Sequence, residues 1–258
     1  MYSLLNKRWQ LASPPQKMVE ALVNSLGISP LVAALLVNRK ITDPEQANIL
    51  IKSDLACLPD PFLMLGMETA VARILRAIEN KESITVYGDY DVDGITAASF
   101  LVHFFRDLGI PFSYYLPNRM EEGYGVNSEA LRKIREGGCT LVITADCGIT
   151  AVREVSAARE IGLDVIVTDH HQIGEEGLPG SIAVLNPHQP GCLYPFRFLS
   201  GVGIVFKLAT AIRTALYKAG WDKDRLPNLK RHLDLFALGT IADVAPLTGK
   251  TTSCPIMG

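Results

Sequence analysis

The 258-residue sequence has little of what marks secreted, membrane or disulfide-stabilised proteins. Its five cysteines are odd in number and widely spaced, and no Cys-x-x-Cys pair occurs, so neither a disulfide framework nor a zinc ribbon is indicated. No run of about 18 apolar residues is present, which excludes a membrane-spanning helix. The first residues, MYSLLNKRWQLASPPQK, lack the apolar core of a secretory signal. We therefore expect a reduced, cytoplasmic protein with no membrane partner.

An excess of charge of one sign is also missing. The chain has 25 Lys and Arg against 27 Asp and Glu, a formal net charge of −2. This balance excludes a disordered polyelectrolyte and a uniformly basic nucleic-acid binder, but it is compatible with a local basic groove. With 48% hydrophobic residues, the chain can bury the core of one large or two modest domains.

Residues 1–80 are predicted to form a helical N-terminal region. In the first three segments of this region, apolar residues recur at helical spacing behind a Pro, Ser or Asp start signal. A further amphipathic pattern follows an extended stretch. The predicted helical segments are 14–27, 29–40, 43–53 and 67–81. We find no chemistry in this region.

From Ser83 the sequence alternates between short apolar runs and amphipathic segments. The predicted strands are 83–88, 111–117, 140–145, 163–169 and 181–187. The predicted helices are 95–109, 127–138, 148–162, 200–220 and 229–243. This alternation predicts an α/β fold, a doubly wound parallel sheet covered on both faces. We expect this domain to span 81–247, followed by a short polar tail, 248–258.

Acidic residues follow three of the predicted strands directly. The residues at these strand ends are Asp89, Asp91 and Asp93, then Asp146, then Asp169-His170-His171. The carboxyl ends of parallel strands lie at one edge of a sheet, where such folds bind ligands near a switch in strand order. We therefore expect these side chains to converge.

Convergence of several carboxylates requires protons or cations, because close negative charges repel and burial disfavours them. Carboxylate oxygens with one or two imidazoles suit Mn²⁺ or Mg²⁺. A cluster of this size favours two ions, an arrangement that stabilises the attacking and leaving oxygens in phosphate-ester hydrolysis. The sequence therefore favours a two-metal phosphoesterase.

Other interpretations of these acids exist. Asp146 alone is compatible with a helix N-cap. The D-x-D-x-D run beginning at Asp89 is not an EF-hand, because its twelfth residue is Phe100 and a strand precedes it. Strand-end acids that bind Mg²⁺ also occur in phospho-receiver domains, but these do not need an adjacent His pair.

The same residues resemble the DHH phosphoesterase family. The matching motifs are VYGDYDVDGITA (86–97), ITADCGI (143–149), DHH (169–171) and LGTIADVAPL (238–247). Two further segments, 115–127 and 185–209, resemble the members of that family that act on single-stranded DNA. The resemblance runs from about residue 8 to residue 247.

The resemblance implies roles for individual residues. Asp91 and Asp93 ligate the two ions, Asp146 bridges them, and His170 and Asp243 complete the second site. Asp89 is a ligand or orients one. His171 faces the scissile phosphate. The implied catalytic residues are Asp146, His170 and His171.

The implied reaction is 5′→3′ hydrolysis of single-stranded DNA that releases 5′-mononucleotides, in DNA repair and recombination, with two Mn²⁺ or Mg²⁺ ions. A repair helicase or a single-strand-binding protein is a candidate partner. The family members continue beyond the fourth motif, and this chain does not. A catalytically incomplete fragment and a small-substrate phosphodiesterase are therefore the alternatives.

Candidate DNA-binding residues lie outside the metal motifs. They are Arg119, Tyr124, Gly201, Gly203 and Lys207. From Lys207 to Arg231 seven cations face two acids, a local charge of +5, which suggests an electrostatic track. A solvated helix face explains the same run. The glycines suit close backbone approach of an anion at a helix N-terminus, or plain packing.

Overall fold

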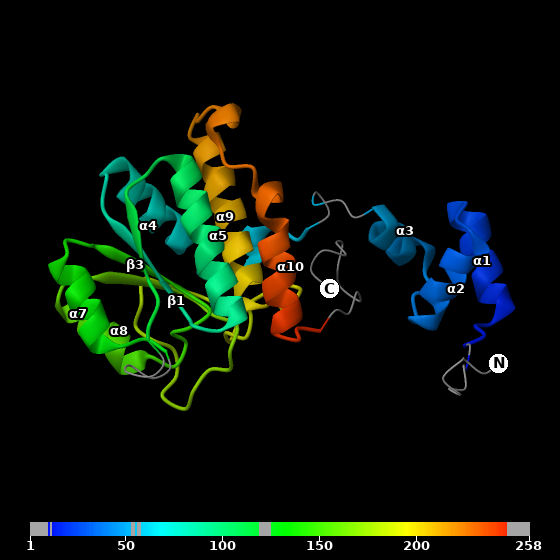
Figure 1. The fold of residues 1–258 in the computed structure, drawn as a ribbon, viewed down its shortest axis with the longest axis horizontal. Coiled ribbons are helices and arrows are strands. Elements are labelled where there is room, and N and C mark those ends of the chain that lie inside the picture. Colours follow the sequence, from blue (N-terminus) through cyan, green and yellow to red (C-terminus); the bar gives the residue numbers. More distant parts are fainter. Residues whose placement is uncertain (1–9, 11, 53–54, 56–57, 119–124, 247–258) are drawn as a thin grey trace, which may run out of the picture. The chain divides into compact units, whose positions relative to one another are not determined.

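A computed structural model describes the chain except residues 1–9, 11, 53–54, 56–57, 119–124 and 247–258 (Figure 1). The chain divides into two compact units, and the sheet-containing unit begins at Pro59. No helix in the described residues is long and apolar enough to cross a membrane.

The first unit contains three short helices. They are α1 (Gln16–Leu26), α2 (Pro30–Asn38) and α3 (Pro44–Lys52). Ser29 caps α2, accepting a hydrogen bond from the Val32 N–H, and Gly27 ends α1 in the left-handed conformation. A small core that includes Leu22, Ala33 and Ala47 joins the three helices. This unit therefore has its own hydrophobic cluster, as the helical pattern predicted.

The second unit is built on a five-stranded parallel sheet of order β2-β1-β3-β4-β5. Its strands are β1 (Ile84–Gly88), β2 (Phe112–Tyr115), β3 (Leu141–Ala145), β4 (Asp164–Thr168) and β5 (Ala183–Leu185). The chain moves from β1 outward to β2, then returns to the other side of β1 to form β3. The strand order therefore reverses between β1 and β3, and this is the switch point at which open α/β sheets bind ligands.

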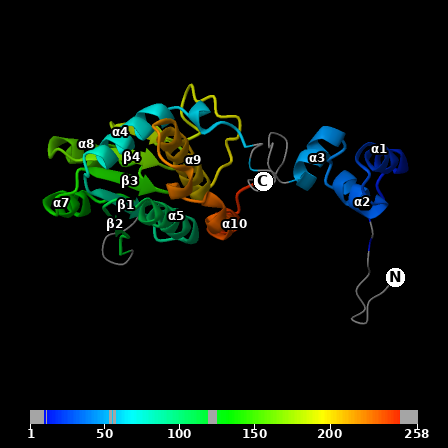
Figure 2. The ribbon, with the colours of Figure 1, turned by 90° about the horizontal axis from the view of Figure 1, so that it is seen from above.

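Helices cover both faces of the sheet (Figure 2). On one side lie α4 (Met67–Glu79), α5 (Val92–Leu108), α9 (Gly201–Lys218) and α10 (Leu233–Ala242). On the other side lie α7 (Ser128–Glu136) and α8 (Val152–Glu160). Short 3-10 turns, η2 (Pro61–Leu63), η3 (Lys223–Arg225) and η4 (Leu229–His232), complete the unit. The predicted doubly wound α/β fold is confirmed.

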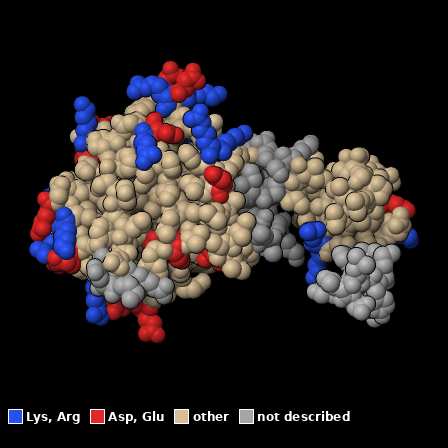
Figure 3. All heavy atoms as spheres, in the orientation of Figure 1, with Lys and Arg blue, Asp and Glu red and all other residues tan. Residues whose placement is uncertain are grey.

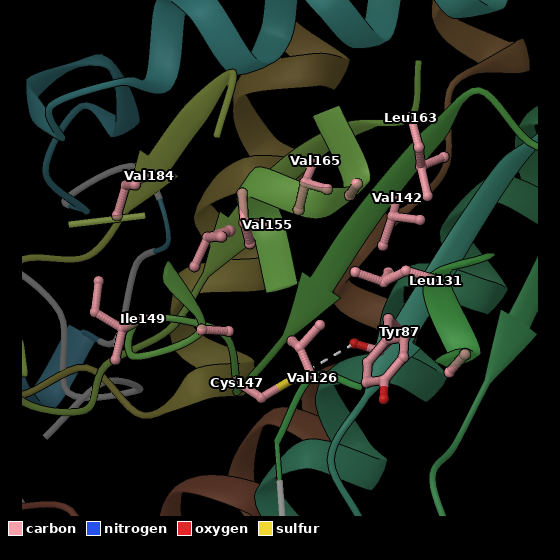
Figure 4. Close-up of a cluster of buried hydrophobic side chains, with 14 of the residues drawn as sticks. Tyr87, Val126, Leu131, Val142, Cys147, Ile149, Val155, Leu163, Val165 and Val184 are labelled. Carbon is pink, nitrogen blue, oxygen red and sulfur yellow. Dashed lines mark hydrogen bonds between the residues drawn. The ribbon is translucent and has the colours of Figure 1, made fainter. Parts of the chain in front are cut away.

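Alternate strand residues face the two helical layers. Figure 4 shows Val142 and Val165 of the sheet packed with Leu131 of α7 and Val155 of α8. Residues of the opposite parity, such as Val86, Ile143 and Ile166, are fully buried on the other face. Burial on both faces explains why the strands are almost wholly apolar.

The predicted boundary near residue 80 is wrong, because α4 belongs to the sheet unit. Its apolar stripe, including Ala70, Ile74 and Ala77, is buried, and α4 packs against α9 and β5. Buried Arg73 of α4 also pairs with Glu82 and, through a short contact, with Asp164 of β4. The helical period of α4 does not reveal which unit its apolar face covers. The tail predicted at 248–258 lies outside the described residues.

Candidate metal centre

The carboxyl edge of the sheet brings the predicted metal ligands together. They come from the ends of β1, β3 and β4, from the first turn of α5 and from the end of α10. Three groups of potential ligands have their atoms within 4.8 Å of one another. The groups are Asp89, Asp91 and Asp146; Asp93, His170 and Asp243; and Asp146, His170 and His171. Shared members make the three groups one continuous cluster.

Asp89 and Asp91 stand at the β1–α5 turn. The buried Asp89 Oδ1 accepts the Tyr90 N–H at 2.7 Å, while its Oδ2 has no hydrogen-bond partner among the described residues. Asp91 is the N-cap of α5, and its Oδ1 accepts the Gly94 N–H at 2.8 Å. Local hydrogen bonds at the start of α5 therefore fix the positions of the Asp89 and Asp91 carboxylates.

Asp93 is held by a second helix. Its two oxygens accept the N–H groups of Gly201, at 2.6 Å, and Val202, at 2.9 Å. These are the first amides of α9, which suit an anion because of the helix dipole. Here the bound anion is the protein's own carboxylate. Gly201 and Gly203 are buried, so their predicted approach to a DNA phosphate is not what this helix terminus does.

Asp146 is the most constrained of the acids. It follows β3 with φ of 67°, a left-handed conformation that only a few non-glycine residues adopt readily. Its side chain is 1% exposed, and neither oxygen has a hydrogen-bond partner in the described chain. A Cβ on Gly201 would come within 2.3 Å of Asp146 Oδ1, so only glycine leaves room for this carboxylate.

His170 connects the acids on either side of it. Its Nε2 lies 3.2 Å from Asp146 Oδ1, and 3.8 Å from both Asp93 Oδ2 and Asp243 Oδ1. None of these contacts is aligned as a hydrogen bond, and Nε2 is buried without a partner among the described residues. Asp243, the C-cap of α10, is about a quarter exposed.

These unpaired atoms fit divalent cations. A buried polar atom without a partner costs about 1–3 kcal/mol, and this cluster holds several of them. They are Asp89 Oδ2, both oxygens of Asp146 and His170 Nε2. Carboxylate oxygens with an imidazole nitrogen form the ligand set that Mn²⁺ and Mg²⁺ accept. The residues present therefore suit the two ions expected from the sequence.

The pKa values of the residues in the cluster also favour the binding of cations. Burial raises the pKa of Asp146 to about 7, although nearby His170 opposes the rise. Burial also raises the pKa of Asp89 and that of Asp93. Burial alone would lower the pKa of His170, but Asp146 and Asp243 outweigh it and raise that pKa. Near neutral pH the cluster thus retains protons, which bound cations would displace.

Asp169 had no role in the sequence prediction beyond its place in the motif, and the structure supplies one. Its Oδ1 accepts the His171 N–H at 3.0 Å and lies 2.7 Å from His171 Nδ1. Its Oδ2 accepts the Ile149 N–H at 2.8 Å. The hydrogen bond that His171 donates to Asp169 raises the pKa of His171 to about 9, so this imidazole is protonated at neutral pH.

Asn186 is a second positioning residue that the sequence reasoning missed. Its Nδ2 donates to the His171 carbonyl at 2.9 Å, and its Oδ1 accepts the His188 N–H at 2.8 Å. Asn186 directly follows β5 and is fully buried. A polar residue immediately after a buried strand is the signal that could have identified it.

Lys207 is not available to DNA. Its side chain is fully buried, its Nζ donates to the Pro59 carbonyl at 3.0 Å, and Nζ lies 5.8 Å from the ring centroid of Tyr194. The predicted DNA contact is therefore wrong, because this cation is enclosed where α9 packs against the chain near Pro59. Arg119 and Tyr124 lie outside the described residues.

The exposed cations of the basic run lie at the C-terminal end of α9 and in the segment that follows it. Figure 3 shows them around the end of α9 and the turns that follow it. They are Lys218, Lys223, Arg225, Lys230 and Arg231. At about 1.5 Å per residue, the 18 residues of α9 place Lys218, its last residue, some 27 Å from its first turn. The predicted track thus does not begin at the site.

Comparison with known proteins identifies relatives of this fold and site. The family model for "DHH family, N-terminal domain" matches residues 83–240. The chain is 47% identical over 240 residues to the single-stranded-DNA-specific exonuclease RecJ of Bacillus subtilis. That match covers 93% of this chain and 29% of the relative, so the chain spans about a third of the length of such relatives.

Two solved structures of Thermus thermophilus RecJ resemble the chain. The complex with Mn²⁺ has a TM-score of 0.69 and 31% identity, covering 92% of this chain and 32% of that one. The complex with Mg²⁺ has a TM-score of 0.57 and 28% identity, covering 92% and 28%. This similar protein thus binds either of the two divalent cations that the carboxylate cluster suits.

Proposed function

The chain belongs to the DHH family, and on this basis we propose that it hydrolyses single-stranded DNA from the 5′ end and releases 5′-mononucleotides. The observation that carries the proposal is the buried cluster at the β1–β3 switch point, where carboxylate and imidazole atoms lack partners within the described chain. The RecJ relatives, named as single-stranded-DNA-specific exonucleases, support the choice of substrate.

The ligand groups suggest how two Mn²⁺ or Mg²⁺ ions are shared. Asp89, Asp91 and Asp146 suit one ion, while Asp93, His170 and Asp243 suit the other. Asp146 lies beside His170 and is the residue best placed to bridge them. When bound, such ions lower the pKa of water and neutralise charge on a phosphodiester.

We assign the protein's own proton transfer to His171. It is held through Nδ1 by Asp169 and is 42% exposed at the edge of the cluster. A protonated imidazole next to the scissile phosphate can hydrogen-bond its oxygens and give a proton to the leaving 3′-oxygen. Asp169 then acts as a positioning residue, because it fixes the ring and favours its charged form.

The biological setting follows from the same assignment. A nuclease of this specificity serves DNA repair and recombination in the bacterial cytoplasm. We propose a repair helicase or a single-strand-binding protein as its partner, since either supplies or holds the single strand. The RecJ relatives come from bacteria, in which DNA lies in the cytoplasm.

Hydrolysis of a 5′-labelled single-stranded oligonucleotide with Mn²⁺ tests the proposal. We expect labelled mononucleotide from the parent, and a rate more than about a hundredfold lower for Asp146→Asn. Asn suits the left-handed backbone of residue 146, so this variant changes charge rather than fold. Asp107→Asn, an exposed position on α5, is the matched control.

Two outcomes would contradict the proposal. Cleavage of a labelled dinucleotide but not of the longer oligonucleotide would indicate a small-substrate phosphodiesterase. No cleavage of either substrate by a folded protein that binds Mn²⁺ would show a catalytically incomplete fragment, since the chain spans 29% of its Bacillus subtilis relative.

A further inference from the structure

A pocket adjoins the cluster on the α8 side of the sheet edge. It has a volume of about 340 Å³, and Asp169, His171 and Glu154 are among the residues that line it. Val126, Ile149 and Ala151 supply its apolar wall. Figure 4 shows Val126 and Ile149 near the loop after β3. Among the described lining residues there is no predicted metal ligand, but His171, which we assigned to the scissile phosphate, is one of them.

We propose that this pocket receives the nucleoside of the 5′-terminal nucleotide, the one released by the reaction. This inference rests on the proposed function, since it takes His171 as the group facing the scissile phosphate. Small-molecule pockets hold roughly 300–1,000 Å³, so 340 Å³ is room for one nucleoside and not for two. A pocket of this size binds a chain end, which matches hydrolysis from an end.

The charges of the lining select a nucleoside and exclude a phosphate. Asp169 and Glu154 are acids, the described lining contains no Lys or Arg, and the imidazole of His171 is already held by Asp169. A phosphate in the pocket would meet two carboxylates, whereas a sugar and base bring apolar faces and N–H and O–H donors. The scissile phosphate, which is attached to the 3′-oxygen of this nucleoside, therefore stays at the His171 end, beside the cluster.

Glu154 also predicts a base preference. It is half-buried in the first turn of α8, and a carboxylate accepts hydrogen bonds but donates none. Cytosine, adenine and guanine carry an exocyclic amine that can donate to it. The one N–H on the pairing edge of thymine lies between two carbonyl oxygens, which a carboxylate repels. A hydrogen bond to a charged group is worth about 1.5–3 kcal/mol, so we expect dCMP to bind about tenfold more tightly than dTMP.

Calorimetric titration of the Mn²⁺-loaded full chain with dCMP, dTMP and 2-deoxyribose 5-phosphate tests the inference without turnover. The parent should bind dCMP at least about tenfold more tightly than the base-free sugar phosphate. Thr150→Trp places an indole at an exposed lining position and should abolish that difference. Glu154→Gln should narrow the preference for dCMP over dTMP.

Matched controls lie on the exposed side of α8, outside the pocket lining. Ser156→Trp and Glu160→Gln should bind all three probes as the parent does. Mn²⁺ affinity and thermal unfolding report whether Thr150→Trp folds. If Thr150→Trp does not fold, Glu154→Gln still tests the pocket, because glutamine has nearly the same shape as glutamate. Equal affinity of the parent for dCMP and deoxyribose 5-phosphate, or parent-like binding by both pocket variants, would overturn the proposal.

The oligonucleotide assay separates this inference from the proposed function. DNA hydrolysis by a parent that shows no pocket-dependent dCMP binding would reject the pocket and keep the nuclease. Pocket-dependent binding of dCMP without DNA hydrolysis would keep the nucleoside site and reject the exonuclease.

Discussion

At the residue scale, the site concentrates negative charge where water is excluded. Asp89, Asp93 and Asp146 are each at most 2% exposed, and burial raises the pKa of each of them. Folding without cations therefore requires some of these groups to keep protons that the unfolded chain would lose. The residues that make the site useful for binding metal thus destabilise the metal-free protein.

The metal-free protein should lose stability as the pH rises from about 4 to about 7. Over this range Asp146 is protonated when folded and ionised when unfolded, so the free energy of unfolding falls by about 1.4 kcal/mol per pH unit for this group. The raised pKa of His170 acts in the same direction, because its stabilisation is lost as the pH rises through that pKa.

Urea unfolding in EDTA at pH 5, 6 and 7 measures this slope. Asp146→Asn should have a shallower slope than the parent and be more stable at pH 7, whereas Asp107→Asn should match the parent. A free energy of unfolding that is constant or increases over this range would contradict the electrostatic account of the cluster.

Replacing Asp169 with Asn should change the pH profile of DNA hydrolysis. The Asp169 hydrogen bond holds the pKa of His171 at about 9, and without this carboxylate that pKa should return toward about 6.5. If protonated His171 is the active form, the alkaline fall in rate should move down by up to about two pH units.

Rates with Mg²⁺ between pH 6 and 9.5, together with Mg²⁺ affinity, measure the effect. Glu160→Gln, which changes an exposed acid at the end of α8, is the matched control and should keep the parent profile. A uniform loss of rate at every pH in Asp169→Asn would indicate a purely structural role.

At the element scale, the ends of two helices complete the cluster of metal ligands that the strand ends supply in part. The N-terminus of α9 anchors Asp93, and the C-terminus of α10 brings Asp243 to the cluster. Helix α10 can lie this close to α5 because Gly239 faces Thr96 and Asp93 without a side chain. Helix packing thus decides whether the second group of ligands assembles.

Gly239→Ala should therefore disturb the site although alanine is the better helix former. Its Cβ would come within 2.3 Å of Thr96 Oγ1 and 2.8 Å of Asp93 Oδ1. Overpacking costs about 1–3 kcal/mol, against a helix-propensity gain of about 1 kcal/mol. We expect a net loss of stability and weaker Mn²⁺ binding, because α10 and Asp243 must move.

Chemical unfolding and Mn²⁺ titration check this expectation. Gly180→Ala is the control, since a Cβ there would meet nothing within 4 Å, and it should change stability by less than about 0.5 kcal/mol. Parent-like Mn²⁺ affinity in Gly239→Ala would show that the close approach of α10 does not matter to the site.

At the scale of the whole molecule, the chain is two units with separate cores. The cluster and every contact described for it lie between Asp89 and Asp243, within the unit that begins at Pro59. The first unit has its own apolar cluster around Leu22 and Ala33. The units should therefore unfold independently, and metal binding should stabilise one of them.

A fragment comprising residues 59–258 should fold and bind Mn²⁺ within about twofold of the full chain's affinity. A fragment comprising residues 81–258 should not, because it lacks α4, whose buried face packs against α9 and β5. Calorimetric unfolding with and without Mn²⁺ distinguishes them. Equal behaviour of the two fragments would show that the domain boundary near residue 80 was correct after all.

The local pattern was sufficient for the secondary structure and for much of the site. Apolar strand runs and helical spacing predicted all five strands, and the acids after β1, β3 and β4 predicted a shared edge. This works because strand polarity in a parallel sheet places every carboxyl end together. Asp243 was found only through family resemblance, since an Asp at a helix end carries no local sign of a metal site.

Only the tertiary structure decided which side chains and helix faces are buried, because this depends on how the elements pack against one another. In the sequence, Lys207 is one cation of a basic run, but in the folded protein its side chain is completely buried. The sequence pattern of α4 assigns it to the N-terminal helical region, but in the structure its apolar face packs on the sheet unit. The sequence by itself determined the fold class, the metal motifs and the family. Burial decided the domain boundary, the positioning roles of Asp169 and Asn186 and the pocket beside His171, because burial depends on contacts between residues distant in the chain.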